Sequence, residues 1–288
     1  MRVYYKFSYR GVEKVPYGKP IVLAPNHTNA FVDPVVVGIL LRQKLRFFAR
    51  GDVFKGRLAK WALDSMSASP MYRLQEGYAE IKKNDKTFEE CRSLLSDDKT
   101  ILLFPEAICI QERRLRPLKK GLARIVFQTE ESFDFKKDIL VIPVGINYSD
   151  AKRFRSKLFI DFGDPVSIKE YEERYKQDKV RTINEFTKTF EQKLSEQMLI
   201  IKDPKNDDLV AGIEEIYLQQ WLKDRSEDIK NLESQYSASR EIADMVNILD
   251  EKNPEVTTLL KEKITNYIEK LRSNRLRDHL LALRISIK

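Results

Sequence analysis

The stretch Ile21-Val22-Leu23-Ala24-Pro25-Asn26-His27 joins a short apolar run to a polar pair. A short run of apolar, partly β-branched residues is typical of a strand buried on both faces of a parallel sheet. In such sheets, ligands bind beyond the carboxyl ends of the strands. We therefore expect Asn26 and His27 to lie at the edge of a sheet where a functional site forms.

Outward from this stretch, similar apolar runs alternate with helical patterns. Strands are expected at residues 46–49, 69–73, 100–104, 139–144 and 157–162, and helices at 29–41, 54–63, 85–95 and 121–129. This alternation predicts an α/β fold, a mostly parallel sheet covered by helices. After residue 165 the pattern is helical, with helices expected at 182–201, 208–223, 226–236, 239–249 and 255–271. We expect an α/β domain over residues 1–164 and an all-helical C-terminal region over residues 165–288.

Composition bounds the class of protein. Of the 288 residues, 42% are hydrophobic and 33% charged, which excludes a largely disordered chain. Two cysteines, Cys91 and Cys109, make no disulfide framework and favour a reducing compartment. Two histidines argue against a histidine-rich metal centre, so no metal is expected. The sequence shows neither a signal peptide nor the ~20 apolar residues of a membrane span, so we expect a soluble or peripheral protein.

The positive charge is concentrated in the first part of the chain. Residues 1–164 carry a net charge of +10, and residues 165–288 carry −2. A basic surface attracts phosphates, anionic lipids, nucleic acid or an acidic partner, although it is also compatible with an ordinary solvated surface.

Four clusters in the sequence contain residue types that could take part in catalysis or binding, or that mark the strands around them. His27 follows a strand and Asp33 comes shortly after, which fits either a general base with its orienting carboxylate or a structural histidine at a helix start. Arg73 ends a second short strand, and a guanidinium suits a phosphate. Glu106 ends a third strand, and a basic loop from Arg113 to Lys120 follows it. The fourth cluster is an apolar strand with a proline, Val141-Ile142-Pro143-Val144.

Taken in order, these clusters resemble the glycerolipid acyltransferases, the superfamily of glycerol-3-phosphate and lysophosphatidate acyltransferases. The family has an Asn-His pair followed by aspartate, a block ending in arginine, a Phe-Pro-Glu-Gly block and an apolar strand with proline. This chain has Asn26-His27…Asp33, Met71-Tyr72-Arg73, Phe104-Pro105-Glu106 and Val141-Ile142-Pro143-Val144. The resemblance covers residues 10–165 and makes residues 1–164 the expected catalytic domain.

The chain departs from the family pattern at two positions. His27 and Asp33 enclose five residues where the family commonly has four, a spacing that resembles one branch of the superfamily. A bulge or loop must absorb the extra residue if the two side chains are to meet. Ala107 replaces the usual glycine, and alanine tolerates positive φ poorly, so we expect the local turn or the approach of substrate to differ there.

The resemblance implies an O-acyltransferase of phospholipid synthesis with a fatty acyl donor and a lysophosphatidate or glycerol-3-phosphate acceptor. His27 would be the general base and Asp33 its orienting group. The resemblance also gives substrate-binding roles to Asn26, Arg73 and Glu106. Position in the chain alone adds three second-choice phosphate contacts: Arg116, Lys119 and Lys120. No cofactor is implied beyond the co-substrate, acyl-CoA or acyl carrier protein. The implied partners also include an anionic membrane surface, with the protein cytoplasmic and peripheral to the inner face of the membrane.

Other interpretations stay open on the sequence. The acceptor could be a non-phosphorylated lipid, or the chain could be an inactive homologue that acts as an interaction module through residues 165–288. A nucleic-acid-binding protein would use the basic loop and no His27, and a metal-dependent hydrolase would need ligands that the sequence lacks. The stretch 53–62 has the pattern of a basic amphipathic helix, which lies in a membrane interface or packs on its own sheet.

Overall fold

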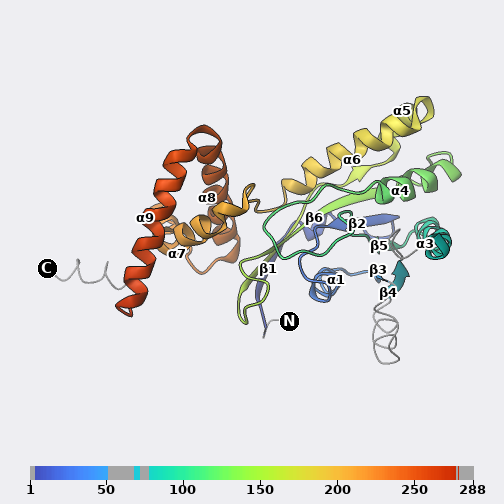
Figure 1. Ribbon diagram of the computed structural model, residues 1–288. Coiled ribbons are helices and arrows are strands. Elements are labelled where there is room, and N and C mark those ends of the chain that lie inside the picture. The colour runs from blue at the N-terminus through green and yellow to red at the C-terminus, as the bar shows by residue number, and fades with distance from the viewer. Residues whose placement is uncertain (1–3, 51–67, 72–77, 277, 279–288) are drawn as a thin grey trace. The chain divides into compact units, whose positions relative to one another are not determined.

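The computed structural model describes residues 4–50, 68–71, 78–276 and 278, and the chain divides into two compact units, Met1–Gln197 and Met198–Lys288. The first unit is built on one sheet covered by helices, which confirms the predicted α/β architecture (Figure 1). The predicted amphipathic helix at 53–62 and Arg73 lie outside the described residues.

The sheet is mostly parallel. Its strands are β1 (Lys6–Arg10), β2 (Ile21–Pro25), β3 (Leu45–Arg50), β4 (Ala68–Met71), β5 (Thr100–Leu102), β6 (Leu140–Tyr148), β7 (Lys157–Phe162) and β8 (Val166–Ser167). Their order is β1-β7-β6-β2-β5-β3-β4, and β8 pairs with β6. The strands β2 to β6 run parallel, whereas β7 and β8 are antiparallel to β6. The carboxyl ends of β2, β5 and β6 therefore meet at one edge.

Helices lie on both faces of this sheet. In the first unit they are α1 (Val32–Gly38), α3 (Tyr78–Ser96), α4 (Gly121–Ser132), α5 (Glu172–Gln177) and α6 (Lys179–Ser195), with 3₁₀ turns η1 (Val12–Lys14) and η4 (Lys169–Tyr171). Figure 1 shows α4 and α6 on one side of the sheet and α1 on the other. All five residues of β2 are buried, and Ile21 and Leu23 belong to the same apolar cluster as Val36 and Val37 of α1. This two-sided burial is why β2 appears as an uninterrupted apolar run.

The first unit extends beyond the boundary expected near residue 165. Helix α6 packs against β6 and α4, and its buried Phe186 and Phe190 are part of the apolar interior. The chain after α6 then approaches β6 closely at Gly145, where an added Cβ would lie 1.8 Å from the carbonyl oxygen of Gln197. Asn147 of β6 also donates a hydrogen bond to that carbonyl. The compact unit therefore ends at Gln197 because α6 is a layer of the α/β fold.

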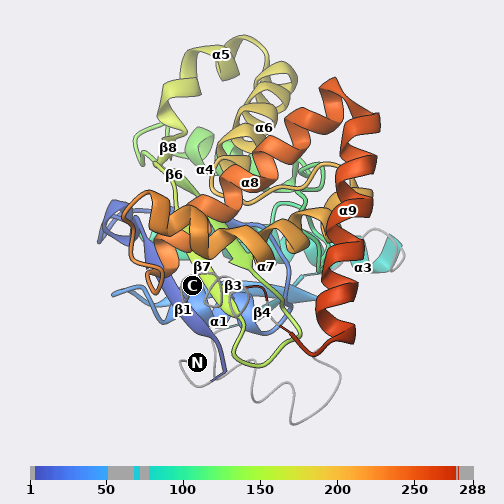
Figure 2. The same cartoon turned by 90° about the vertical axis from the view of Figure 1, so that its left-hand side faces the viewer.

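The second unit is helical, as expected for the end of the chain. It contains η5 (Pro204–Asn206), α7 (Asp207–Asp224), α8 (Leu232–Lys252) and α9 (Pro254–Ser273), and the three long helices contact one another (Figure 2). One continuous helix, α8, replaces the two expected at 226–236 and 239–249. Its start is capped by the Asn231 side chain, and Ala238, in the expected gap, is buried. Packing therefore overrides the weak helix propensity of the serines around it. Among the described helices, none is long and apolar enough to cross a membrane.

Gly145 offers a test of how α6 is held on the sheet. Gly145→Ala places a methyl group against backbone, so we expect the free energy of unfolding of the first unit to fall by about 1–3 kcal/mol in urea denaturation. The matched control is Gly121→Ala at the start of α4, where an added Cβ meets nothing within 4 Å. That control is expected to be neutral or stabilising by up to about 1 kcal/mol, because alanine is the better helix former. Equal effects of the two substitutions would contradict this account of the contact.

Candidate active site

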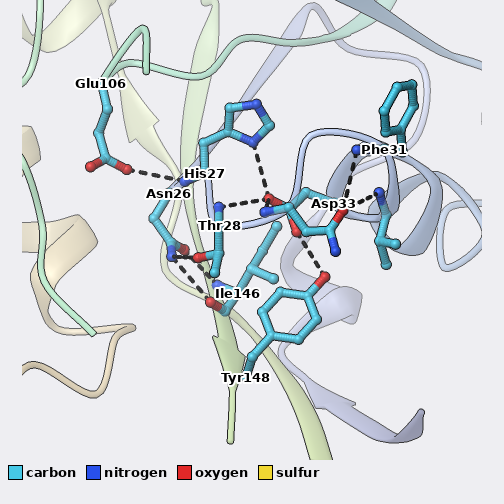
Figure 3. A network of polar contacts seen from close by, with 10 residues as sticks. Asn26, His27, Thr28, Phe31, Asp33, Glu106, Ile146 and Tyr148 are labelled. Carbon is cyan, nitrogen blue, oxygen red and sulfur yellow. Dashed lines mark hydrogen bonds and ion pairs between the residues drawn. The ribbon is translucent and has the colours of Figure 1, made fainter. Parts of the chain in front are cut away.

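His27 and Asp33 meet at the carboxyl end of β2. The His27 Nδ1 atom lies 3.0 Å from Oδ2 of Asp33, and the other ring nitrogen points away from the carboxylate (Figure 3). Because a carboxylate only accepts hydrogen bonds, Nδ1 carries a proton, and Nε2 presents its lone pair when the ring is neutral. The His27 side chain keeps 14% of its surface exposed, whereas Asp33 has none. This arrangement orients an accessible histidine as a proton acceptor.

A tight turn absorbs the extra residue between His27 and Asp33. The Asn29 side chain accepts hydrogen bonds from the backbone N–H groups of Phe31 and Val32, and the Asp33 N–H donates to the Asn29 carbonyl. The Asp33 carboxylate accepts in return from the N–H groups of Thr28 and Asn29, at 2.8 and 2.7 Å. The five-residue spacing therefore brings the two side chains together through Asn29.

The surroundings of His27 raise its pKa. Burial of the ring lowers the pKa, but hydrogen bonds with Asp33 and with the Cys109 thiol, together with the Asp33 charge, outweigh this and raise it to about 9. The imidazolium form is therefore stabilised by the site, which is the property that an orienting carboxylate gives a general base.

Three residues at the site were not recognised from the sequence. The buried Tyr148 hydroxyl, at the end of β6, donates to the second oxygen of Asp33 at 2.8 Å. Burial and the adjacent Asp33 charge raise the pKa of Tyr148 far above its ordinary value, so the hydroxyl stays a donor. The Phe104 ring stacks on His27 with centroids 3.7 Å apart. Cys109 is exposed, and the next residue, Ile110, donates its N–H to the His27 carbonyl. Only the register of β6 against β2 could have indicated Tyr148.

Asn26 and Glu106 were expected to bind substrate, but both are buried and engaged with backbone. The Asn26 amide accepts from the N–H of Ile146 and donates to its carbonyl, which joins the end of β2 to β6. The Glu106 carboxylate accepts from the N–H groups of His27 and Arg116, at 3.0 and 2.9 Å. Burial raises the pKa of Glu106, and these hydrogen bonds counteract the rise. We therefore interpret Asn26 and Glu106 as residues that position His27 and the basic loop.

The basic loop is thereby held near the His27 strand end. Arg116 pairs with Glu112 and keeps 44% of its side chain exposed. Lys119 and Lys120 are exposed at the start of α4, and neither makes an ion pair within the described residues. Of the expected phosphate-binding residues, these three lie within the part of the chain that the structure describes, and Arg73 lies outside it. Within the same part, no group of three or more His, Cys, Asp or Glu side chains could hold a metal ion.

Ala107 keeps the backbone conformation that a glycine would favour. Its φ is +57°, in the left-handed region, and its N–H closes a turn on the Phe104 carbonyl. Ala107 thus holds a conformation that an alanine rarely adopts and a glycine adopts readily.

A mostly parallel sheet with a partly buried histidine–aspartate contact at its carboxyl edge defines the class, an α/β protein with a polar site beyond the strand ends. Residues 6–147 match the family model described as Acyltransferase. The match identifies residues 6–147 as an acyltransferase domain.

Curated relatives and one solved structure are similar to this chain. It is 29% identical over 167 residues to an uncharacterised acyltransferase of Schizosaccharomyces pombe, covering 57% of this chain and 22% of the relative. It is 29% identical over 112 residues to glycerol-3-phosphate O-acyltransferase 2 of Saccharomyces cerevisiae, covering 38% of this chain and 15% of the relative. The chain thus spans about a fifth of the length of these relatives. The crystal structure of the 1-acyl-sn-glycerophosphate (LPA) acyltransferase PlsC from Thermotoga maritima aligns with a TM-score of 0.43 at 20% identity, over 66% of this chain and 72% of that one.

Asp33→Asn tests the cause of the raised His27 pKa. We expect the pKa to fall from about 9 to 6.5 or below, because burial lowers it once the carboxylate charge is gone. The ring-proton NMR signals of the two histidines report this directly, and His27→Gln assigns them. Tyr148→Phe is the matched control: it removes a hydrogen bond from Asp33 without removing charge, so the His27 pKa should stay at or above its parent value. A lower His27 pKa in Tyr148→Phe, or an unchanged His27 pKa in Asp33→Asn, would show that the Asp33 charge is not the cause of the raised value.

Ala107→Gly is expected to stabilise the protein. Glycine relieves the left-handed strain, about 1–2 kcal/mol, and loses part of the gain to the entropy of the unfolded chain. We expect a net rise of about 0.5–1 kcal/mol in the free energy of unfolding, measured by urea denaturation. The control Ala123→Gly, inside α4, should lower it by about 1 kcal/mol or more. Destabilisation by both substitutions would show that Ala107 is not strained.

Proposed function

We propose that this chain is an O-acyltransferase that moves a fatty acyl group from a thioester donor to the hydroxyl of a glycerol-phosphate-type acceptor. The observation that carries the proposal is the oriented His27–Asp33 pair at the carboxyl edge of the sheet. The match of residues 6–147 to the acyltransferase family and the known reaction of the two Saccharomyces cerevisiae relatives, named as glycerol-3-phosphate O-acyltransferases, support the choice of reaction.

The chemistry needs one base. The Nε2 atom of His27 takes the proton of the acceptor hydroxyl as its oxygen attacks the thioester carbonyl carbon. Asp33 holds the ring and stabilises the imidazolium that forms. The carbon–sulfur bond then breaks, and the leaving thiolate takes the proton back from the imidazolium. An ester and a free thiol result, and His27 returns to its neutral form.

Cations near His27 are suited to the phosphate of the acceptor. The Glu106 carboxylate accepts hydrogen bonds from the backbone N–H groups of both His27 and Arg116, which holds the basic loop beside His27. The cations of this loop are Arg116, Lys119 and Lys120. Arg73 stays a proposed phosphate ligand on the motif alone. The net charge of +10 over residues 1–164 would also attract the donor, whether acyl-CoA or acyl carrier protein, since both are anionic. Products of this kind are membrane lipids, so we propose a peripheral position on the inner face of a membrane, in phospholipid synthesis.

Acyl transfer by the purified protein and His27→Gln is the decisive test. Acyl-CoA and acyl carrier protein are offered with glycerol-3-phosphate or lysophosphatidate, and ester product is measured. Glutamine keeps a polar group near Asp33 and supplies no base, so we expect a loss of about a hundredfold or more in kcat/KM. In the parent protein, kcat/KM should rise with pH and level off near 9, because only the neutral form of His27 accepts the proton.

The alternatives give distinct results. Equal activity in His27→Gln would exclude the general-base role. Product with a non-phosphorylated lipid acceptor alone would move the substrate class away from glycerol phosphates. The lack of ester product with every acceptor, from folded protein, would favour an inactive homologue.

A further inference from the structure

A short loop between β6 and β7, residues 149–156, combines exposed cations with an exposed aromatic ring. Lys152, Arg153 and Arg155 are all exposed, and Phe154 between them keeps 55% of its surface in solvent. One acidic residue, Asp150, lies in the same loop, where it accepts hydrogen bonds from the N–H groups of Lys152 and Arg153. Within the described residues, none of the three cations makes an ion pair with a side chain. The loop therefore presents net positive charge.

The loop is held in a defined conformation. The N–H of Arg155 donates to the Tyr4 carbonyl at 2.7 Å, and the Tyr5 hydroxyl donates to the Ala151 carbonyl at 2.9 Å. Phe154 packs edge-on against Tyr4, which is itself 45% exposed. Arg155 adopts a φ of +59°, a conformation that arginine rarely takes. The aromatic pair Tyr4–Phe154 is thus displayed at the surface by backbone contacts.

The sheet topology places this loop at the edge that carries the site. Strand β6 ends at Tyr148, whose hydroxyl contacts Asp33, and the loop begins at the next residue. Because β7 runs antiparallel to β6 and β1 runs parallel to β7, Lys157 and Tyr4 are at that edge as well. Arg113 of the basic loop donates a hydrogen bond to the Ser149 carbonyl, which joins the two cationic loops. Figure 1 shows the β6–β7 loop beside the start of β1.

We propose that the β6–β7 loop, with Tyr4, is a docking surface for an anionic lipid bilayer. The cations match the charge of anionic headgroups, and each contributes to binding near such a surface. Tyrosine and phenylalanine side chains enter the boundary between headgroups and acyl chains. An aromatic ring flanked by cations fits this boundary better than a flat protein surface, where such rings would need a pocket. The inference rests on the proposed function for its meaning, since docking here brings a lipid substrate to His27.

Binding of this 288-residue chain to vesicles tests the surface without any catalysis. Sedimentation with phosphatidylglycerol–phosphatidylcholine vesicles is compared with pure phosphatidylcholine for the parent protein and its variants. Lys152→Glu combined with Arg153→Glu should weaken binding to the anionic vesicles by at least about thirtyfold, since two attractive charges become repulsive. Phe154→Ser should weaken it by roughly tenfold and leave the salt dependence intact.

A matched control separates local docking from net charge. Lys99→Glu combined with Lys136→Glu changes the net charge by the same amount as the double substitution in the loop. Both lysines are exposed and lie just before β5 and β6, at the opposite end of these strands. This control should lose no more than about threefold. Equal losses in the two double variants, equal binding of the parent to neutral vesicles, or tighter binding to single-stranded RNA than to vesicles would overturn the proposal.

Activity on a water-soluble pair keeps the two proposals distinguishable. With glycerol-3-phosphate, a short-chain acyl-CoA and no vesicles, Phe154→Ser should match the parent and the charge-reversed loop variant should match the Lys99→Glu, Lys136→Glu control, because the loop takes no part in the chemistry. If the parent transfers no acyl group yet its vesicle binding follows the loop charge, the docking surface stands and the proposed function fails. If acyl transfer is present and vesicle binding ignores the loop, the docking surface alone is wrong.

Discussion

The Asp33 carboxylate has no exposure to solvent. The organisation of the site depends on the hydrogen-bond donors that offset the cost of burying it. A buried charge is costly unless hydrogen-bond donors surround it. Four donors do so here: the N–H groups of Thr28 and Asn29, the His27 ring and the Tyr148 hydroxyl. These donors come from the end of β2, the turn that follows it and the end of β6. One carboxylate therefore fixes the geometry of three segments and the orientation of the proposed base.

The polar residues next to His27 act mainly on backbone. Parallel strands leave unpaired N–H and carbonyl groups where they end, and buried groups of this kind need partners. Asn26 pairs with both backbone groups of Ile146, and Glu106 pairs with the N–H groups of His27 and Arg116. A family motif can thus contain residues whose role is to hold the edge of the sheet. Among the motif residues that the structure describes, His27 combines a partly exposed side chain with a ring nitrogen suited to accept a proton.

Local patterns predicted the fold and the contact between His27 and Asp33, and tertiary contacts account for what they missed. The uninterrupted apolar runs of β2 and β6 indicated two-sided burial, and the spacing of His27 and Asp33 indicated that they could meet. Tyr148 reaches Asp33 across 115 positions of sequence, so no local pattern could connect them. The extent of the first unit depends on Gln197 packing at Gly145, which is another long-range contact. The backbone partners of Asn26 and Glu106 could not be predicted, because a motif identifies a residue type without telling which neighbour it bonds.

The antiparallel pairing of β7 with β6 decides which end of the sheet carries the β6–β7 loop. If β7 ran parallel to its neighbour, the connection from β6 would have to cross to the far end of the sheet. Because β7 is antiparallel, the chain turns back directly after Tyr148, and its cationic loop stays beside the residues that surround Asp33. The N-terminal strand, parallel to β7, starts at the same edge and supplies Tyr4 as support for Phe154. The topology thus brings the oriented His27 and a charged, aromatic surface to one side of the sheet, the arrangement on which both proposals rest.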